Sequence, residues 1–429
     1  MKADSKVTAK VKLSGLLSTV LLMLLFVTQP GEAIPRFVAF TRLPTAENAM
    51  FSDDMQTEKY DPLSIIRSEG LRQVSLLLEL FPGARSIALA GGIIADIDDK
   101  TALGLREQTP DIIIESLDSS LSTIKTYWSA DTTHLSGEAP PPWNHTVSGV
   151  DVLKESGLTG RGTHIGIIAR NFYYEHTALA GKITNIKHFG LASEARNVND
   201  LHLVHPLGIL AGFEEDRYSG IAPETDISLA LLSGKPVKTD MLLEAVEWIL
   251  QQEQRPDIIL FCTDFSTSAP AAVARILFAC RNAGIIPVVA AGNNPSQITG
   301  MAALPCCITV GAVDRWKQRA LFSGQGPVIY ENAQICKPDF CEPGSAISGP
   351  AENNTYKLGS GTLQAAAHFA GTFLLMRQAM PTVDPEYVIT AIKATTQDLG
   401  APGMDNETGL GLPSPSAALE YIINPPVQN

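Results

Sequence analysis

A serine between two glycines, followed by a run of small residues, is the stretch whose residue types could position a reaction. Gly359 and Gly361 permit a tight backbone turn, and the alanines after it predict a helix thin enough to lie in a packed core. Such a helix presents its free N-terminal amides to whatever lies at the turn. Leu363, which is apolar, follows that turn. The stretch therefore has the form of a nucleophile turn without a nucleophile, and a small-residue helix of an ordinary α/β protein is the alternative.

Written out, residues 361–371 read GTLQAAAHFAG. They resemble GTSMAAPHVAG, the serine motif of the subtilisin-like serine peptidases (subtilases). Leu363 occupies the place of the nucleophilic serine in that motif. The resemblance implies a fold in which helices cover both faces of a parallel sheet, and a peptide-bond hydrolase that needs no cofactor and no metal for its chemistry.

Further phrases extend this resemblance, in matching order and spacing, from Gly157 to about Leu419. SGLTGRGTHIGIIAR is similar to the family's aspartate motif, with Ala169 in the place of the aspartate. HLVHPLGILAG is similar to HGTHVAGIIAG, which puts His202 on the catalytic histidine. AAGNN carries the family's AAGN, so Asn293 matches the side-chain donor that stabilises the oxyanion. Residues 308–327 and 337–344 resemble two framework phrases.

The resemblance implies a triad that has lost two members, leaving His202 and Asn293 as vestigial site residues. Removing the nucleophile of such a triad costs on the order of 10⁶ in turnover, and the remaining groups recover only about 10³ over water. Ser360 and Thr362 are displaced along the turn, and a misplacement of about 1 Å can cost 10²-fold. We therefore expect a pseudoprotease that serves as a binding or regulatory module for an unknown protein or peptide partner.

Two other interpretations stay open on the sequence. One is a serine endopeptidase with an unorthodox triad. The other is an inert scaffold whose N-terminal domain inhibits another peptidase. Asp264 bears on the first, because the segment Cys262-Thr263-Asp264 replaces the Ser-Leu-Gly of the family's substrate-binding strand and puts a carboxylate where backbone would meet a peptide.

The N-terminus carries the pattern of a secretory signal peptide. Lysines precede an apolar run from Leu13 to Val27, and small residues stand at 31 and 33. A run of that length is short of the roughly 20 residues that a bilayer needs, so cleavage is favoured over a retained anchor. We expect a secreted or extracytoplasmic protein that, once cleaved, has no membrane attachment.

Composition excludes one class of partner and leaves the cysteines ambiguous. Lys and Arg number 32 against 45 Asp and Glu, a net charge of −13, which argues against a nucleic-acid surface. The six cysteines match no zinc pattern. Cys262 and Cys280 lie in apolar elements and are predicted to be buried thiols, whereas Cys336 and Cys341 are close enough to clip a loop.

Four segments are predicted along the chain: a signal peptide at 1–33, a propeptide-like inhibitor domain at 34–120, a Pro-rich linker at 121–149 and a subtilisin-like domain at 150–424. In the second segment, strands at 36–40, 86–97 and 111–117 alternate with helices at 62–81 and 100–108. This β-α-β-β-α-β order predicts a small α+β, ferredoxin-like domain. In the last segment, apolar strands at 163–169, 226–232, 257–262, 285–291 and 307–313 alternate with helices, which predicts a parallel sheet with its functional site at the carboxyl ends of the strands.

Overall fold

The computed structural model describes residues 34–40, 62–81, 83–109, 111–124, 126–128, 142–170, 176–190, 202–234 and 236–426. The predicted signal peptide and residues 129–141 of the predicted linker lie outside this range. The chain divides into two compact units, one of 1–119 with 270–283 and the other of 120–269 with 284–429. Each unit is described by itself.

The first unit contains a four-stranded antiparallel sheet in the order β2-β3-β1-β4. Its elements are β1 (Ile34–Phe40), α3 (Pro62–Leu80), β2 (Arg85–Ile87), β3 (Gly92–Ile97), α4 (Asp99–Gln108), β4 (Ile112–Ser116) and α10 (Ala271–Asn282). The predicted β-α-β-β-α-β order is the observed order over the described residues. Apolar residues of α3, such as Val74 and Leu77, pack against those of β3 in one hydrophobic core. Helix α10 is capped by Glu115, whose two carboxylate oxygens accept from the Ala271 and Ala272 amides at 2.7 Å each.

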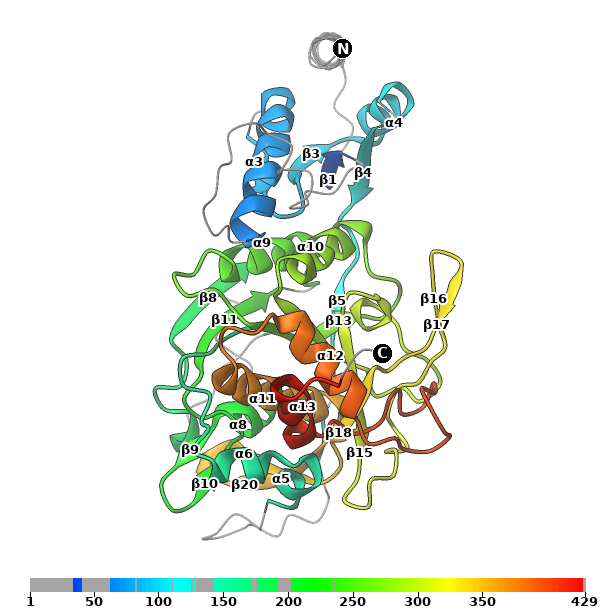
Figure 1. The fold of residues 1–429 in the computed structure, drawn as a ribbon. Coiled ribbons are helices and arrows are strands. Elements are labelled where there is room, and N and C mark those ends of the chain that lie inside the picture. Colours follow the sequence, from blue (N-terminus) through cyan, green and yellow to red (C-terminus); the bar gives the residue numbers. More distant parts are fainter. Residues whose placement is uncertain are drawn as a thin grey trace. The chain divides into compact units, whose positions relative to one another are not determined.

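The second unit is built on a seven-stranded parallel sheet in the order β18-β15-β14-β12-β7-β11-β8 (Figure 1). Its strands are β7 (His164–Arg170), β8 (Asn185–Gly190), β11 (Asp226–Ser233), β12 (Ile258–Phe261), β14 (Ile286–Ala290), β15 (Ile308–Val313) and β18 (Phe340–Pro343). The five central strands match the predicted ones closely. The two edge strands, β8 and β18, were not predicted, because β8 is mostly exposed and polar and β18 holds a glutamate and a proline.

Side-chain alternation along β7 shows how helices cover the two faces of this sheet. Ile165 and Ile167 belong to the core cluster that includes α8 (Val204–Ala211) and α11 (Thr362–Ala379). Gly166 points to the other face, where a Cβ atom would lie 2.5 Å from Ile249 at the end of α9 (Thr239–Ile249). The sheet is thus a buried parallel sheet of the kind predicted.

Shorter elements complete the second unit. They are β5 (Leu121–Thr123), β6 (Tyr127–Trp128), α5 (Trp143–Ser148), α6 (Val150–Glu155), η1 (Thr177–Leu179), β9 (Phe213–Glu214), β10 (Tyr218–Ser219), β13 (Thr263–Phe265), η2 (Met301–Ala303), β16 (Val328–Tyr330), β17 (Ala333–Ile335), β19 (Ile347–Pro350), η3 (Glu352–Asn354), β20 (Tyr356–Ser360), α12 (Pro385–Thr395) and α13 (Pro415–Ile423). Three of these, β5, β6 and α5, fall in the segment 121–149, for which the sequence predicted a linker.

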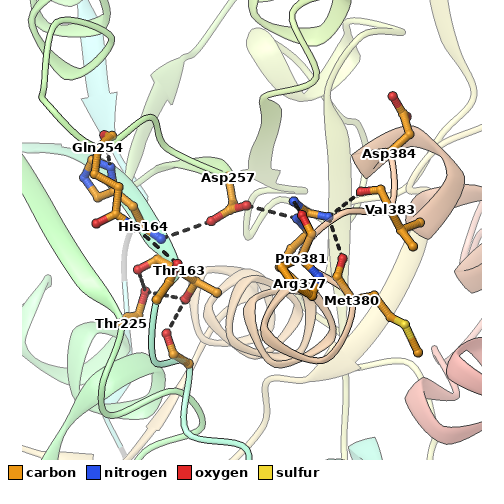
Figure 2. Close-up of polar contacts among 12 residues, drawn as sticks. Thr163, His164, Thr225, Gln254, Asp257, Arg377, Met380, Pro381, Val383 and Asp384 are labelled. Atoms are coloured by element: carbon orange, nitrogen blue, oxygen red, sulfur yellow. Dashed lines mark hydrogen bonds and ion pairs between the residues drawn. The ribbon is translucent and has the colours of Figure 1, made fainter. Parts of the chain in front are cut away.

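Arg377, near the end of α11, holds the helix terminus to the sheet (Figure 2). Its guanidinium donates to Asp257 Oδ1 at 3.0 Å and to the backbone carbonyls of residues 380, 381 and 383 at 3.0, 3.0 and 2.5 Å. Asp257 Oδ2 in turn accepts from the amide of His164, the first residue of β7, at 3.0 Å. One side chain therefore satisfies carbonyls beyond the helix end that would otherwise need other partners.

All six cysteines are free thiols in the structure. Cys262 and Cys280 are buried as predicted, and burial raises the pKa of the Cys262 thiol to about 12. Cys336 and Cys341 are both free, so the loop clip that their spacing suggested does not form.

Candidate functional site

The turn at residues 359–361 connects β20 to α11. Gly361 has an extended backbone, with φ 163° and ψ 162°, so it does not use the left-handed conformation that glycine favours. Gly359 instead permits a close approach: a Cβ atom there would lie 2.9 Å from the His205 ring, and one at Gly349 would lie 2.8 Å from it. The glycine at 359 is therefore needed to make room for the His205 imidazole, not to form a tight turn.

Leu363 and Ala169, at the predicted serine and aspartate positions, are each 1% exposed. Leu363 lies in the first turn of α11 and Ala169 near the carboxyl end of β7, and both belong to the same hydrophobic core cluster. Neither side chain can carry a proton or attack a carbonyl. These two positions contribute apolar packing.

His202, predicted to be the counterpart of the catalytic histidine, lies in the turn before α8 and is half-buried. Asn293 follows β14, and its Oδ1 accepts from the backbone N and the Oγ1 of Thr362 at 2.9 and 2.8 Å. These two hydrogen bonds fix the plane of the carboxamide and direct its Nδ2 away from Thr362. Its predicted role as an oxyanion donor stays a prediction.

The sequence analysis missed His205, the second histidine of HLVHPLGILAG, which lies at the centre of a buried hydrogen-bond chain. Its Nε2 donates to the carbonyls of Ile347 and Lys357 at 3.0 and 3.3 Å. That assignment leaves Nδ1 as an acceptor for Gln364 Nε2, at 3.3 Å. One signal in the sequence could have identified His205. It lies within an apolar helix, where a histidine is expected to be buried, and a fully buried imidazole ring needs hydrogen-bond partners for both nitrogens.

His368, one turn further along α11 than Gln364, continues this polar chain. Its Nδ1 donates to the carbonyl of Gln364 at 2.8 Å, and its Nε2 accepts from Asn144 Nδ2 at 2.8 Å. Burial lowers the pKa of His205 and of His368 to about 4 each. Both rings are therefore neutral at pH 7 and serve as hydrogen-bonding groups.

Residues 121–128, here called the strap, pair with two strands that border this site. β5 pairs antiparallel with β13, matching Leu121 to Phe265 and Thr123 to Thr263. β6 pairs with the end of β20, matching Tyr127 to Ser360. The strap thus passes from the 263–265 strand to the turn before Leu363, and residue 125 within it lies outside the described residues.

Side chains of the strap contact the polar chain directly. Thr126 Oγ1 accepts from Gln364 Nε2 at 3.1 Å, and the Trp128 ring meets the His205 ring edge to face at 5.2 Å. The Tyr127 ring packs against Phe322 with centroids 5.6 Å apart. These contacts show that the strap packs against Gln364 of α11 and His205 of α8.

Asp264, in the middle of β13, was expected to place a carboxylate where backbone would meet a peptide. The side chain instead turns into the protein and accepts from the amides of Phe265, Met301 and Ala302 at 2.7, 2.7 and 3.3 Å. Burial outweighs these hydrogen bonds and raises the pKa of the carboxyl to about 7. Asp264 thereby joins β13 to η2 and leaves the backbone edge of β13 to the strap.

Two negative findings apply to the described part of the chain. None of its helices combines the length and apolar character that crossing a bilayer requires. Within the same residues, no three or more His, Cys, Asp or Glu side chains are grouped so that they could hold a metal ion.

Known proteins similar to this chain are subtilisin-like proteases. A 300-residue alignment with the subtilisin-like protease PopC of Myxococcus xanthus is 27% identical and covers 62% of this chain and 61% of PopC. The minor extracellular protease Epr of Bacillus subtilis is 27% identical over 277 residues, 63% of this chain and 40% of Epr. Subtilisin DY of Bacillus licheniformis is 26% identical over 270 residues, 60% of this chain and 92% of that protein. The chain thus spans less than two thirds of the first two of these relatives.

The model of the subtilase family matches residues 160–411, more than half of the chain. The matched region contains the parallel sheet, His202, Asn293 and the β20-α11 turn. On this match and the seven-stranded parallel sheet that it encloses, the chain belongs to the subtilase family.

Proposed function

We propose that this subtilase has lost peptide-bond hydrolysis and acts as a secreted binding or regulatory module. One observation carries the proposal: Leu363 and Ala169, which the motif resemblance assigns to the serine and aspartate positions, are buried in one apolar cluster. A triad without its nucleophile and without the carboxylate that orients the imidazole loses nearly all of its rate.

The hydroxyls nearest to Leu363 have other hydrogen-bond partners, which supports this proposal. Thr362 is fully buried and donates through Oγ1 to Asn293 Oδ1. Ser360 Oγ accepts from the amide of Ala346 at 2.8 Å. A hydroxyl that replaces the missing serine would have to leave these positions.

The strap supports the second part of the proposal, that binding of a partner at the edge of β13 is regulated. Substrate-like antiparallel pairing with β13 is the contact through which an extended peptide adds to a sheet edge. Here residues 121–123 make that contact, so a protein or peptide partner would have to displace them. In this proposal, residues 34–120 form an uncleaved propeptide-like domain, residues 150–424 form the subtilisin-like domain, and the protein is exported after removal of residues 1–33.

Labelling with a fluorophosphonate serine probe separates this proposal from a serine endopeptidase with an unorthodox triad. We expect no labelling of the purified full chain under conditions in which an active subtilisin is labelled stoichiometrically. Stoichiometric labelling that disappears in Ser360→Ala or Thr362→Ala would overturn the proposal and identify the nucleophile.

A further inference from the structure

Three asparagines of the chain begin the sequence Asn-X-Ser/Thr, with X other than proline, which is the acceptor sequon for an N-linked sugar. They are Asn144, Asn353 and Asn406. A sugar at any of them requires export of the chain, which is a part of the proposed function. The structure separates the three asparagines, because a sugar chain is bulky and hydrated and must stay outside the fold.

Asn144 lies in α5 and is 6% exposed. Its Nδ2, the atom that would carry the sugar, donates to His368 Nε2 of α11 at 2.8 Å. A sugar on this nitrogen would have to fit where the side chain of α5 meets α11. A chain with a sugar at Asn144 could therefore not adopt this structure.

Asn406 is half-buried, in a sequon whose other residues also pack against the protein. Its backbone carbonyl accepts from the amide of Gly326 at 2.9 Å, and a Cβ atom at Gly326 would lie 2.8 Å from Asn406 Oδ1. Thr408, which completes this sequon, is 4% exposed and donates through Oγ1 to the carbonyl of Leu399 at 2.7 Å. The carboxamide of Asn406 thus has little room for a bulky substituent.

Asn353 lies at the tip of the hairpin that joins β19 to β20. The amide of Thr355 donates to the carbonyl of Glu352 at 3.1 Å and closes a turn with Asn353 and Asn354 at its centre. These two asparagines have φ values of 56° and 54°, the positive values that a type I′ hairpin turn requires at both central positions. The sequon is therefore presented at a turn, on the outside of the sheet.

The two asparagines of this turn have different surroundings. Asn354 Oδ1 accepts from the amide of Thr177 at 3.0 Å, which ties the turn to η1. Asn353 is exposed, and within the described residues its side chain has no hydrogen-bond partner. Asn353 Nδ2 can therefore carry a substituent without the loss of a contact in the fold.

We propose that Asn353, and neither Asn144 nor Asn406, carries an N-linked oligosaccharide when a cell that makes such glycans exports the chain. The donor is an oligosaccharide joined to a lipid diphosphate. Asn353 Nδ2 forms a bond to the anomeric carbon of the sugar, and the bond from that carbon to the diphosphate oxygen breaks. The lipid diphosphate leaves, and Nδ2 gives up one proton to the transferase.

Intact mass and peptide mapping of the full chain secreted by insect cells test the proposal. We expect a mass above that of the sequence, which peptide N-glycosidase removes while converting the linked asparagine to aspartate. Asn353→Asp keeps the size of the side chain and suits the left-handed conformation, and it should abolish the added mass. Asn332→Asp is the matched control and should keep it, because Asn332 is an exposed turn asparagine with φ 64° that begins no sequon.

Thr355 allows a second pair of variants that leave Asn353 in place. Thr355→Ser keeps the sequon and should keep the sugar, whereas Thr355→Val removes the sequon hydroxyl and should lose it. The same measurements on a chain in which a proven secretory leader replaces residues 1–33 separate a failure of the predicted export from a failure at Asn353. Secreted protein without a sugar at Asn353, or with one at Asn144 or Asn406, would overturn the proposal.

Discussion

At the residue scale, Leu363 is an apolar side chain at the position where the motif resemblance predicts the catalytic serine. Its side chain is almost fully buried at the start of α11, so Leu363→Ser removes apolar contacts and puts a hydroxyl among core residues. We predict that the variant loses about 3 to 5 kcal/mol of unfolding free energy and gains no hydrolysis, measured by urea unfolding and a fluorogenic peptide assay. Leu321→Ser is the matched control, because Leu321 is 87% exposed and its loss should change little.

A vestigial site is tested by restoring both missing groups. Hydrolysis by Leu363→Ser combined with Ala169→Asp, with none in the wild type, would show that His202 and Asn293 keep their catalytic geometry. Hydrolysis by Leu363→Ser alone would contradict the prediction, because it would mean that the histidine needs no carboxylate here.

His205 gives stability a pH dependence whose direction follows from its pKa. The folded-state pKa is about 4, below the roughly 6.5 of an unfolded histidine. As pH falls below 6.5, the unfolded chain binds a proton that the folded chain excludes, so this part of the stability is lost between about pH 6.5 and pH 4. The loss is about 2 kcal/mol between pH 6.5 and pH 5.

Replacing His205 by glutamine, which cannot be protonated, should therefore flatten the fall in unfolding free energy between pH 6.5 and pH 5. His368 contributes a similar term and is left intact, so the fall should shrink but persist. His188→Gln, at an exposed residue of β8, controls for the loss of one histidine. An unchanged slope in His205→Gln would mean that the ring is accessible to protons in the folded state.

At the element scale, the strap is held by two backbone pairings and by the contact of Trp128 with His205. We predict that Trp128→Ala loosens β6 and speeds amide hydrogen exchange in β20 and in residues 126–128, because the aromatic contact that anchors the β6 pairing is removed. Tyr127→Phe should not do so, since it keeps the ring against Phe322 and removes only a long 3.4 Å hydrogen bond to the Asn293 carbonyl. Equal exchange in both variants would show that backbone pairing alone holds the strap.

Arg377 fixes the C-terminal end of α11, and replacing it should lower the free energy of unfolding. Arg377→Met keeps most of the apolar stem but leaves Asp257 and three backbone carbonyls without their donor. We predict a loss of about 3 kcal/mol or more in urea unfolding, because partly buried groups lose a charged partner. Arg161→Met, which breaks an exposed ion pair with Glu224, should have little effect. Similar losses of unfolding free energy in the two variants would contradict a specific role for Arg377.

Elements that are buried on both faces were predictable, and those that depend on a partner strand were not. The central strands of the sheet read as continuous apolar runs, and their observed bounds differ from the predicted ones by about one residue. Residues 121–128 read LSTIKTYW, and their apolar positions, 121, 124, 127 and 128, do not alternate with polar ones, so the pattern does not indicate strands there. Their strand conformation depends on pairing with β13 and β20, which lie more than a hundred residues away in sequence.

Part of the candidate site could also be predicted from the sequence, and part could not. Glycine and alanine spacing located the β20-α11 turn, and the family motif indicated which residues are missing. His205 and the inward turn of Asp264 were not foreseen, because a side chain's hydrogen-bond partners come from distant segments, Ile347 and Lys357 in one case and Met301 and Ala302 in the other. Sequence spacing indicates where a residue lies along its element but does not name such partners.

At the scale of the whole molecule, the two proposed functions, a pseudoprotease and an active serine endopeptidase, differ in whether the chain cuts itself next to the strap. The family resemblance implies that active subtilases cut their own propeptide with their own serine, and the motif comparison puts Leu363 at the position of that serine. If the chain cannot cut itself, the propeptide-like domain stays covalently attached and the strap stays paired with β13 and β20. An attached strap binds at an effective concentration in the millimolar range or above, so an outside peptide must compete with it.

We therefore predict that the exported protein begins near Ile34 and runs as one chain of roughly 395 residues. N-terminal sequencing and intact mass of protein secreted by a host lacking extracellular peptidases would measure this. Active subtilisin, expressed with its propeptide in the same host, controls for the ability of the assay to detect self-cleavage. A new N-terminus between Asp118 and Asn144, retained after addition of metallopeptidase inhibitors to the culture but absent in Ser360→Ala, would mean that this chain cleaves itself. That result would refute the pseudoprotease proposal and leave the fold assignment intact, because the parallel sheet and the family match do not depend on the identity of the nucleophile.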